Sequence, residues 1–271
     1  MVPNSQQPIV ELQSWFDTDM GQYALKWEQL KIDALVADVF GYRAIQVGLP
    51  QVNLLRQNRM PFKAYVGQTL IEPSIASTWQ ASVVAEPEYL PFDSNSIDLL
   101  ILPHALECSQ DQHAVLREAH RVLVPEGRVV VSGFNPLSLW GFRHHLPFLK
   151  PWLPACLEDD VAPNKIKDWL RLLSFEIDRG HFGCYAPALK SQKWLNRFTF
   201  MEPAGDRWWP IFGAVYVVSA VKKVASMHLI TPNWQRQKKR RHSRQTVGAT
   251  YQKSRNMTQS ITETLSEQKG S

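Results

Sequence analysis

Short apolar runs alternate with helical patterns through the middle of the chain. The first five runs show no alternation with polar residues, so each is expected to be a strand buried on both faces, as in a parallel sheet. Together with two later runs, the expected strands span residues 44–47, 63–66, 82–85, 97–102, 128–133, 175–178 and 214–220. The pattern predicts an α/β fold in which helices cover both faces of the sheet.

The clearest helix lies between the fourth and fifth of these strands. Ser109 and Gln112 have the spacing of a capping box, and residues 115, 119, 122 and 123 form one apolar stripe. The Pro-Glu-Gly turn at residues 125–127 then leads into the fifth strand. The segment is therefore expected to be a β-α-β unit, and such crossovers are almost always right-handed.

The remaining patterns predict the domain organisation. Residues 1–41 carry apolar side chains at helical spacing and are expected to be an N-terminal helical extension, with Gly41 as its stop. Residues 42–222 are expected to form the main domain, with a helix at residues 163–173 and a loop-rich insertion before the last strand. Residues 223–271 are expected to be a basic, disordered tail.

The net charge of +5 comes from that tail. Residues 232–271 hold nine Lys or Arg against two Glu, a balance of +7, so the rest of the chain carries −2. The basic composition therefore predicts no basic groove in the folded part. The tail has a charge density suited to non-specific contact with nucleic acid or an anionic surface, but a merely solvating role is the simpler interpretation.

The cysteines and the hydrophobic segments favour a cytoplasmic protein. Cys108, Cys156 and Cys184 are odd in number and form no Cys-x-x-Cys pair, which argues against a disulfide framework and a zinc site, and no metal is expected. The first residues lack the basic and apolar regions of a signal peptide. The most apolar stretch, residues 208–221, is interrupted by Pro and Gly and is too short to span a bilayer, so it is expected to be a buried strand and its approach.

A series of short motifs in residues 90–136 resembles the class I S-adenosylmethionine (SAM) dependent methyltransferases, and within them the type 11 subgroup. The motifs are Leu-Pro-Phe at 90–92, Ser-Ile-Asp at 96–98, Leu-Arg-Glu at 116–118, Arg-Val-Leu at 121–123 and Pro-x-Gly at 125–127. The resemblance implies a Rossmann-like, mostly parallel sheet of seven strands with an antiparallel last strand. Asp98 is expected to hold backbone amides, Arg121 to pair with Glu118, and Gly127 to free a turn.

The same resemblance places the cofactor at the carboxyl ends of the strands. After strand one the family has a glycine-rich loop, of which this chain keeps Gly48, followed by Leu49 and Pro50. After strand two the family has a carboxylate that binds the ribose; here Gly67 and Gln68 stand without an acid, and Gln68 is the expected substitute.

Two further loops complete the expected SAM site. Glu86, followed by Pro87, falls where the family often has Asp beside the adenine amino group, and Leu102 and His104 come at the end of strand four. Gly48 as a simple turn glycine and Glu86 as a solvated loop acid are equally consistent with the sequence. Two of the four cofactor loops thus depart from the family pattern.

Methyl transfer needs alignment of donor and acceptor, and some acceptors also need a base. The candidates at the expected sheet edge are His104, Glu107, Asn135, His144 and His145, of which His104 and His144 are the predicted catalytic residues. A packed or capping His is the simpler interpretation of each. The loop after strand four lacks the Asn/Asp-Pro-Pro-aromatic motif of adenine and glutamine methyltransferases, which disfavours those acceptors.

An aromatic segment follows strand five. Residues 137–162 include Trp140 and Phe142 and are expected either to cap the site and select an apolar or planar acceptor, or to close the edge of the core. The leading hypothesis is a SAM-dependent methyltransferase that acts on a small molecule. The alternative is a non-catalytic binding or regulatory protein with the same fold, which could associate with RNA through its tail.

Overall fold

The computed structural model describes residues 7–71, 73–76, 78–144, 161–187, 197 and 201–224; at residues 7–11, 73, 74 and 144 it describes the backbone alone. Contacts between residues divide the chain into two units, Met1–Val224 and Ala225–Ser271. The first unit carries the helices and strands, and the second, which holds nearly all of the basic tail, lies outside the described residues. In chain order the elements are α1 (Gln7–Phe16), α2 (Asp19–Val36), β1 (Arg43–Val47), β2 (Phe62–Gly67), α3 (Pro73–Ala76), β3 (Ala81–Val84), β4 (Ile97–Pro103), α4 (Gln112–Val122), β5 (Leu123–Phe134), α5 (Leu139–His144), α6 (Pro163–Leu172), β6 (Phe175–Gly183), α8 (Met201–Trp208), the 3₁₀ turn η2 (Pro210–Phe212) and β7 (Val215–Lys222).

The seven strands form one sheet in the order β3-β2-β1-β4-β5-β7-β6. The pairs from β3 to β5 are parallel, whereas β7 is inserted between β5 and β6 and runs antiparallel to both. This confirms the predicted Rossmann-like sheet with its antiparallel last strand. The strand order reverses between β1 and β4, which is where ligands bind in open sheets of this kind.

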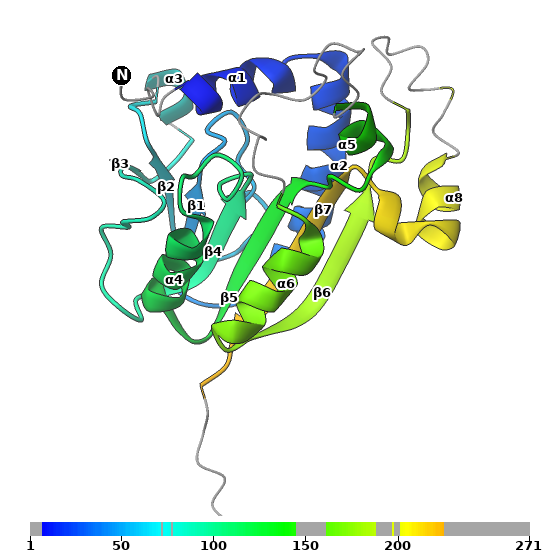
Figure 1. Ribbon diagram of the computed structural model, residues 1–271. Coiled ribbons are helices and arrows are strands. Elements are labelled where there is room, and N and C mark those ends of the chain that lie inside the picture. Colours follow the sequence, from blue (N-terminus) through cyan, green and yellow to red (C-terminus); the bar gives the residue numbers. More distant parts are fainter. Residues whose placement is uncertain are drawn as a thin grey trace, which may run out of the picture. The chain divides into compact units, whose positions relative to one another are not determined.

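Helices cover both faces of the sheet, as predicted. Figure 1 shows α4 and α6 on one face and α2 on the other. Successive residues of β4 divide between two cores: Leu100 and Leu102 pack with residues of α4 and α6, and Leu99 and Ile101 pack with residues of α2. Since both faces of the strand are buried, an uninterrupted apolar run is what the sequence must supply there.

Four details of the prediction were wrong. The N-cap of α4 is Asp111, whose carboxylate accepts from the Ala114 amide at 2.9 Å, because the helix begins three residues after Ser109. β3 is an edge strand and is half exposed rather than buried on both faces. Residues 125–127 lie within β5, and the left-handed residue there is Glu126, with φ 64°, while a Cβ at Gly127 would come within 2.8 Å of the Val124 carbonyl.

The fourth correction concerns residues 201–212, where loop was expected. They form α8 and η2, and the apolar approach to β7 is exposed rather than buried. Trp208, Trp209, Ile211 and Phe212 all have more than half of their surface in solvent. The core begins just before the strand, at Ala214.

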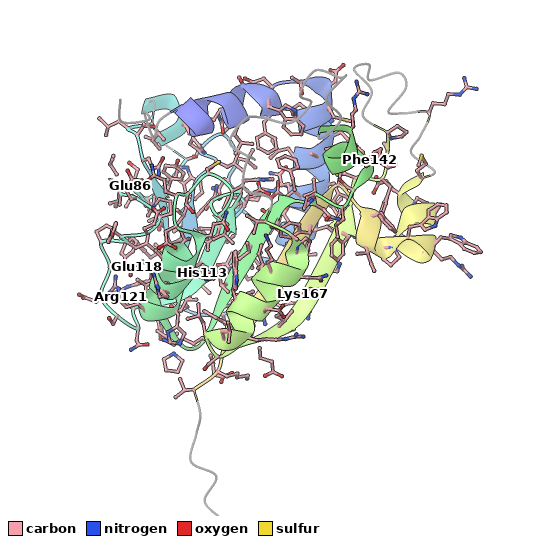
Figure 2. The ribbon with its side chains drawn as sticks, viewed as in Figure 1. Glu86, His113, Glu118, Arg121, Phe142 and Lys167 are labelled. Atoms are coloured by element: carbon pink, nitrogen blue, oxygen red, sulfur yellow. The ribbon has the colours of Figure 1, made fainter. Side chains whose placement is uncertain are left out.

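The family motifs fix the sheet at its amino edge. The Asp98 carboxylate accepts from the backbone amides of Tyr42 and Arg43, both at 2.9 Å, and so ties the start of β1 to β4. Glu118 and Arg121 lie side by side on α4 (Figure 2) and pair at 2.7 Å. Both also reach the backbone of Leu90, so the pair holds the loop before β4 against the helix. The two contacts predicted from sequence are confirmed.

Replacing Asp98 with Ala should lower the free energy of unfolding by about 1–3 kcal/mol, because two backbone amides lose a charged acceptor. The matched control is Asp38→Ala at an exposed acid, which should change stability by less than about 0.5 kcal/mol. Urea unfolding of the three proteins measures the difference. Equal stability of the two variants would contradict the role given to Asp98.

Candidate functional site

The turn after β1 is built around a left-handed glycine. Gly48 has φ 89°, and its amide donates to the Val66 carbonyl at 2.9 Å, which joins the ends of β1 and β2. Leu49, also left-handed at φ 51°, is buried. A side chain at Gly48 would be strained by the backbone even though the nearest atom to its Cβ, the Pro103 carbonyl oxygen, is 3.5 Å away.

Gln46 holds this turn in place and was missed in the sequence. Its fully buried side-chain amide donates to the carbonyls of Gly48, Leu49 and Val52 at 2.9–3.0 Å, and its oxygen accepts from the Leu54 amide at 3.0 Å. Its role was not predicted because a single glutamine within an apolar run looks like an ordinary strand residue. Its position two residues before a left-handed glycine is the signal that could have found it.

The ends of β2 and β3 bring Gln68 and Glu86 together. The side-chain amide of Gln68 donates to the Glu86 carboxylate, and the Gly67 carbonyl accepts from the Ala85 amide at 2.9 Å. The Gln68 side-chain oxygen is buried and has no hydrogen-bond partner among the described residues. An orphaned acceptor of this kind is costly unless a ligand or water donates to it.

A polar cavity of about 290 Å³ opens beside this pair. Its lining consists of Gln68, Glu86, Glu88, Tyr89, Cys108, Gln110 and Asp111. Tyr89 is 78% exposed and stands at the margin, so it does not fill the space. Most of the lining residues carry polar or charged groups, and the cavity lies near the point where the strand order reverses, which suits the nucleoside half of a cofactor.

We call the carboxyl edge of the sheet formed by Gly48, Gln68 and Glu86 the rim. His104 lies beneath it in a buried cluster of ionisable groups. It is 1% exposed and sits in a left-handed turn with φ 52°, directly after β4. Its Nδ1 lies 2.7 Å from the carboxylate of Glu107, and its Nε2 lies 3.4 Å from that of Glu28 on α2. Glu107 also accepts from the Phe134 amide at 2.5 Å, so the cluster links α2, β4 and β5.

The neighbouring carboxylates determine the protonation state of His104. Burial alone would lower its pKa, but Glu28 and Glu107 outweigh that effect and raise the pKa to about 10. The ring is then an imidazolium at neutral pH with both nitrogens facing carboxylates. An imidazolium has no lone pair to accept a proton, so this geometry suits a positioning residue better than a general base.

Helix α1 lies across the carboxyl edge of the sheet above β1 and β2 (Figure 1). Leu12 and Gln13 from this helix, together with the ends of β1, β2 and β4, enclose a space of only about 40 Å³. The predicted residues that line it are Gly48, Leu49, Gly67, Gln68, Pro87 and His104. The structure thus gathers six of the predicted cofactor residues around one point, which α1 covers.

The other predicted residues lie elsewhere. Glu86 lines the adjoining polar cavity, whereas Leu102 is buried in the core and belongs to neither lining. His144 ends α5, but its side chain and all of His145 lie outside what the structure describes. Asn135 is a structural residue, because its amide nitrogen donates to the carbonyls of Ile211 and Gly213 at 2.7 and 3.0 Å.

The two described aromatic residues of the segment after β5, Trp140 and Phe142, differ in burial. Trp140 is buried and donates from its indole nitrogen to the Ala186 carbonyl at 2.8 Å, which matches the interpretation as part of the core edge. Phe142 is 67% exposed. Residues 145–160, most of the predicted cap, lie outside the described part of the chain.

The residues at the rim fit SAM in part. The orphaned Gln68 oxygen and the polar cavity beside Glu86 have the donor and acceptor character that a ribose and an adenine require. The space beside Gly48, where the methionine half would lie, is too small for it while Leu12 and Gln13 remain in place. The nucleoside half therefore fits the structure as it stands, and the amino-acid half fits only if α1 moves.

Fold and rim together define a methyltransferase-type α/β protein, and comparisons with known proteins agree. Residues 51–131 match the family described as a methyltransferase domain. The chain is 31% identical over 171 residues to the uncharacterized protein YafS of Escherichia coli (strain K12), which covers 63% of this chain and 68% of YafS. It is also 40% identical over 63 residues to the biotin biosynthesis bifunctional protein BioHC of Saccharophagus degradans, but those residues are 23% of this chain and 11% of BioHC.

Solved structures of methyltransferases share the fold. The methyltransferase in complex with the Haloferax volcanii Trm112 activator matches with a TM-score of 0.55 at 14% identity, covering 82% of this chain and 100% of that one. A SAM-dependent methyltransferase from Thermotoga maritima matches with a TM-score of 0.50 at 16% identity, covering 78% and 100%. The chain belongs to the class I SAM-dependent methyltransferases, type 11.

The buried cluster predicts a pH dependence of stability. A folded-state pKa of about 10 lies above the unfolded value of about 6.5, so the stabilisation is fully present below pH 6.5 and is lost as the pH rises toward 10. The free energy of unfolding should therefore fall between pH 6.5 and 9, by at most about 1.4 kcal/mol per pH unit.

The variant His104→Gln should lack this component of the slope, which chemical unfolding at a series of pH values measures. His113→Gln, at an exposed histidine on α4 (Figure 2), is the matched control and should keep the wild-type slope. A wild-type slope in the His104 variant would show that the imidazolium does not form.

Proposed function

We propose that this protein transfers a methyl group from SAM to a small-molecule acceptor. The observation that carries the proposal is the meeting of the Gly48 turn, the Gln68–Glu86 pair and the His104 loop at the strand-order reversal, beside a polar cavity of about 290 Å³. Membership of the methyltransferase family supports the reaction type. A reducing, cytoplasmic location belongs to the same proposal, since the three cysteines of the sequence are odd in number and form no Cys-x-x-Cys pair.

Each residue at the rim has a proposed task in holding the cofactor. The Gln68 oxygen accepts a ribose hydroxyl, Glu86 lies beside the base, and the left-handed Gly48 lets the amino-acid half approach the backbone. SAM supplies an already activated methyl group, so the protein mainly aligns donor and acceptor and excludes water. His104 acts as a positioning residue, because its contacts with Glu28 and Glu107 fix the loop that follows β4.

The proposed site makes binding of SAM and its demethylated product directly measurable by isothermal titration calorimetry. Micromolar binding of both is expected. Gln68→Ala should weaken both by about 3- to 12-fold, the worth of one hydrogen bond. Gln51→Ala, at an exposed glutamine, is the matched control and should bind as the wild type does.

The same titration tests the second candidate, a non-catalytic protein with this fold. The covered Gly48 turn and the absence of an acid directly after β2 favour that candidate. A folded sample that binds neither compound would support it and overturn the methyltransferase proposal. Contact of the tail with nucleic acid or an anionic surface stays a prediction, because residues 225–271 lie outside the described part.

Entry of the methionine half should displace α1. Hydrogen exchange of the backbone amides of residues 7–16 is therefore expected to become faster when SAM is bound, whereas exchange in α6, whose residues line neither cavity at this edge, should stay the same. Mass spectrometry of peptides from the two helices measures the change. Saturating SAM with unchanged exchange in α1 would show that the amino-acid half binds elsewhere.

A further inference from the structure

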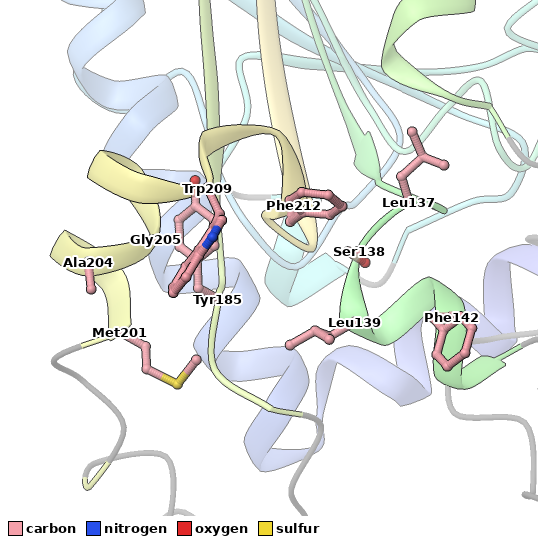
Figure 3. Close-up of a pocket in the computed structure, with 10 residues that line it drawn as sticks. All are labelled: Leu137, Ser138, Leu139, Phe142, Tyr185, Met201, Ala204, Gly205, Trp209 and Phe212. Atoms are coloured by element: carbon pink, nitrogen blue, oxygen red, sulfur yellow. The ribbon is translucent and has the colours of Figure 1, made fainter.

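Another cavity, of about 630 Å³, lies between α5, the end of β6, α8 and η2 (Figure 3). We call it the apolar pocket. Its described lining consists of Leu137, Ser138, Leu139, Phe142, Tyr185, Met201, Ala204, Gly205, Trp209 and Phe212. It shares no described lining residue with the cavities at the Gly48 rim, so the SAM site leaves it unexplained.

The part of the lining that the structure describes carries no charged side chain, and its polar side-chain groups are the hydroxyls of Ser138 and Tyr185 and the indole nitrogen of Trp209. The Ser138 hydroxyl donates to the Asn135 carbonyl at 2.6 Å and accepts from the Gly141 amide, and the Tyr185 hydroxyl donates to the Pro210 carbonyl at 3.0 Å. Both hydroxyls in the lining are therefore already engaged. An uncharged hydrocarbon group is the chemistry that such a pocket stabilises.

The wall formed by α8 is fixed in place. Glu202, in the first turn of α8, accepts from the Tyr23 hydroxyl and from the Tyr185 amide, the latter at 3.0 Å. Gly205 packs so closely on the Tyr185 ring that a Cβ there would lie 2.2 Å from it. The pocket is thus preformed, and a ligand would pay little ordering entropy on entering it.

The mouth of the pocket is apolar and open to solvent. Leu139 and Phe142 on one side (Figure 3) are 57% and 67% exposed, and Trp209 and Phe212 on the other are 57% and 54% exposed. Covering such a patch removes apolar surface from water and is favourable. A ligand of modest size would cover both sides at once.

The pocket lies at the same edge of the sheet as the SAM site. Leu137 and Ser138 follow the carboxyl end of β5, and Tyr185 follows that of β6. Only β4 separates β5 from β1, so the two strands lie about 10 Å apart at the usual strand spacing, and β5 continues three residues beyond the level of Val47, about another 10 Å along the strand. A molecule longer than about 14 Å can occupy the pocket with one end and reach toward the Gly48 rim with the other.

We propose that the apolar pocket binds the hydrocarbon part of the methyl acceptor, and that the acceptor is an amphiphilic small molecule whose reactive polar end points to the SAM site. The inference rests on the proposed function for its acceptor role, but the binding of hydrocarbon can be measured without SAM. The acceptor's polar end is selected at the rim and its apolar end in the pocket.

The probes are straight-chain alcohols from butan-1-ol to decan-1-ol, titrated calorimetrically into the full chain. Affinity should rise about fourfold for each added methylene group, since each buries a similar apolar area. Ala204→Trp, which fills the pocket from α8, should weaken decan-1-ol binding at least tenfold. Leu172→Trp, at an exposed leucine that ends α6, is the matched control and should bind as the wild type does.

A second variant, Leu139→Asp, places a charge at the exposed mouth of the pocket and should weaken decan-1-ol binding at least tenfold. Its melting temperature should equal that of the wild type. It therefore tests the pocket even if the Ala204→Trp variant fails to fold. Affinity independent of chain length, or wild-type binding by both pocket variants, would overturn the proposal.

SAM is titrated separately: retained SAM binding with lost alcohol binding is the expected result for the two variants. Wild-type chain that binds decan-1-ol but not SAM would overturn the proposed function and leave the pocket standing.

Discussion

The ion cluster of Glu28, His104 and Glu107 is the contact on which the site depends. It joins three parts of the fold that are far apart in sequence: α2, the turn after β4, and the Phe134 amide at the end of β5. Burying two carboxylates costs free energy that their contact with an imidazolium must offset, and removal of one partner leaves an uncompensated charge. The cluster thereby fixes the left-handed His104 turn, which forms the floor of the rim.

The two halves of the cofactor site above the His104 turn differ in how open they are. The nucleoside half is open, polar and lined by Gln68 and Glu86, while the amino-acid half lies under Leu12 and Gln13 of α1. Phe16 of the same helix packs edge-on to His104, with ring centroids 5.3 Å apart. Movement of α1 is therefore coupled to the cluster below, and the free energy of opening the helix subtracts from the affinity for SAM.

Most of the fold could be predicted from the sequence, because it follows from local patterns. Uninterrupted apolar runs mark strands buried on both faces, and the contacts of Asp98 and of Glu118 with Arg121 follow from motifs only a few residues long. The wrong details have separate causes: the exposure of β3 depends on its place at the sheet edge, whereas α8 lies in a short segment that contains Pro and Gly.

The site was harder to predict, since it depends on contacts between distant residues. The sequence named Gly48, Gln68 and His104 from their positions at strand ends, and the structure brings them together. It offered no signal for Glu28, an acid in a helix that could equally face solvent, although that residue raises the pKa of His104. The closure of the rim by α1 and the apolar pocket beside α8 likewise require the packed structure.

The central claim is that the carboxyl edge between β1 and β4 binds SAM, and a crystal structure of the full chain with S-adenosylhomocysteine tests it most directly. The account predicts a ribose hydroxyl donating to the Gln68 oxygen, the base beside Glu86, and the homocysteine beside Gly48 with Leu12 and Gln13 displaced. A nucleoside bound away from this edge, in crystals with the ligand at full occupancy, would contradict it.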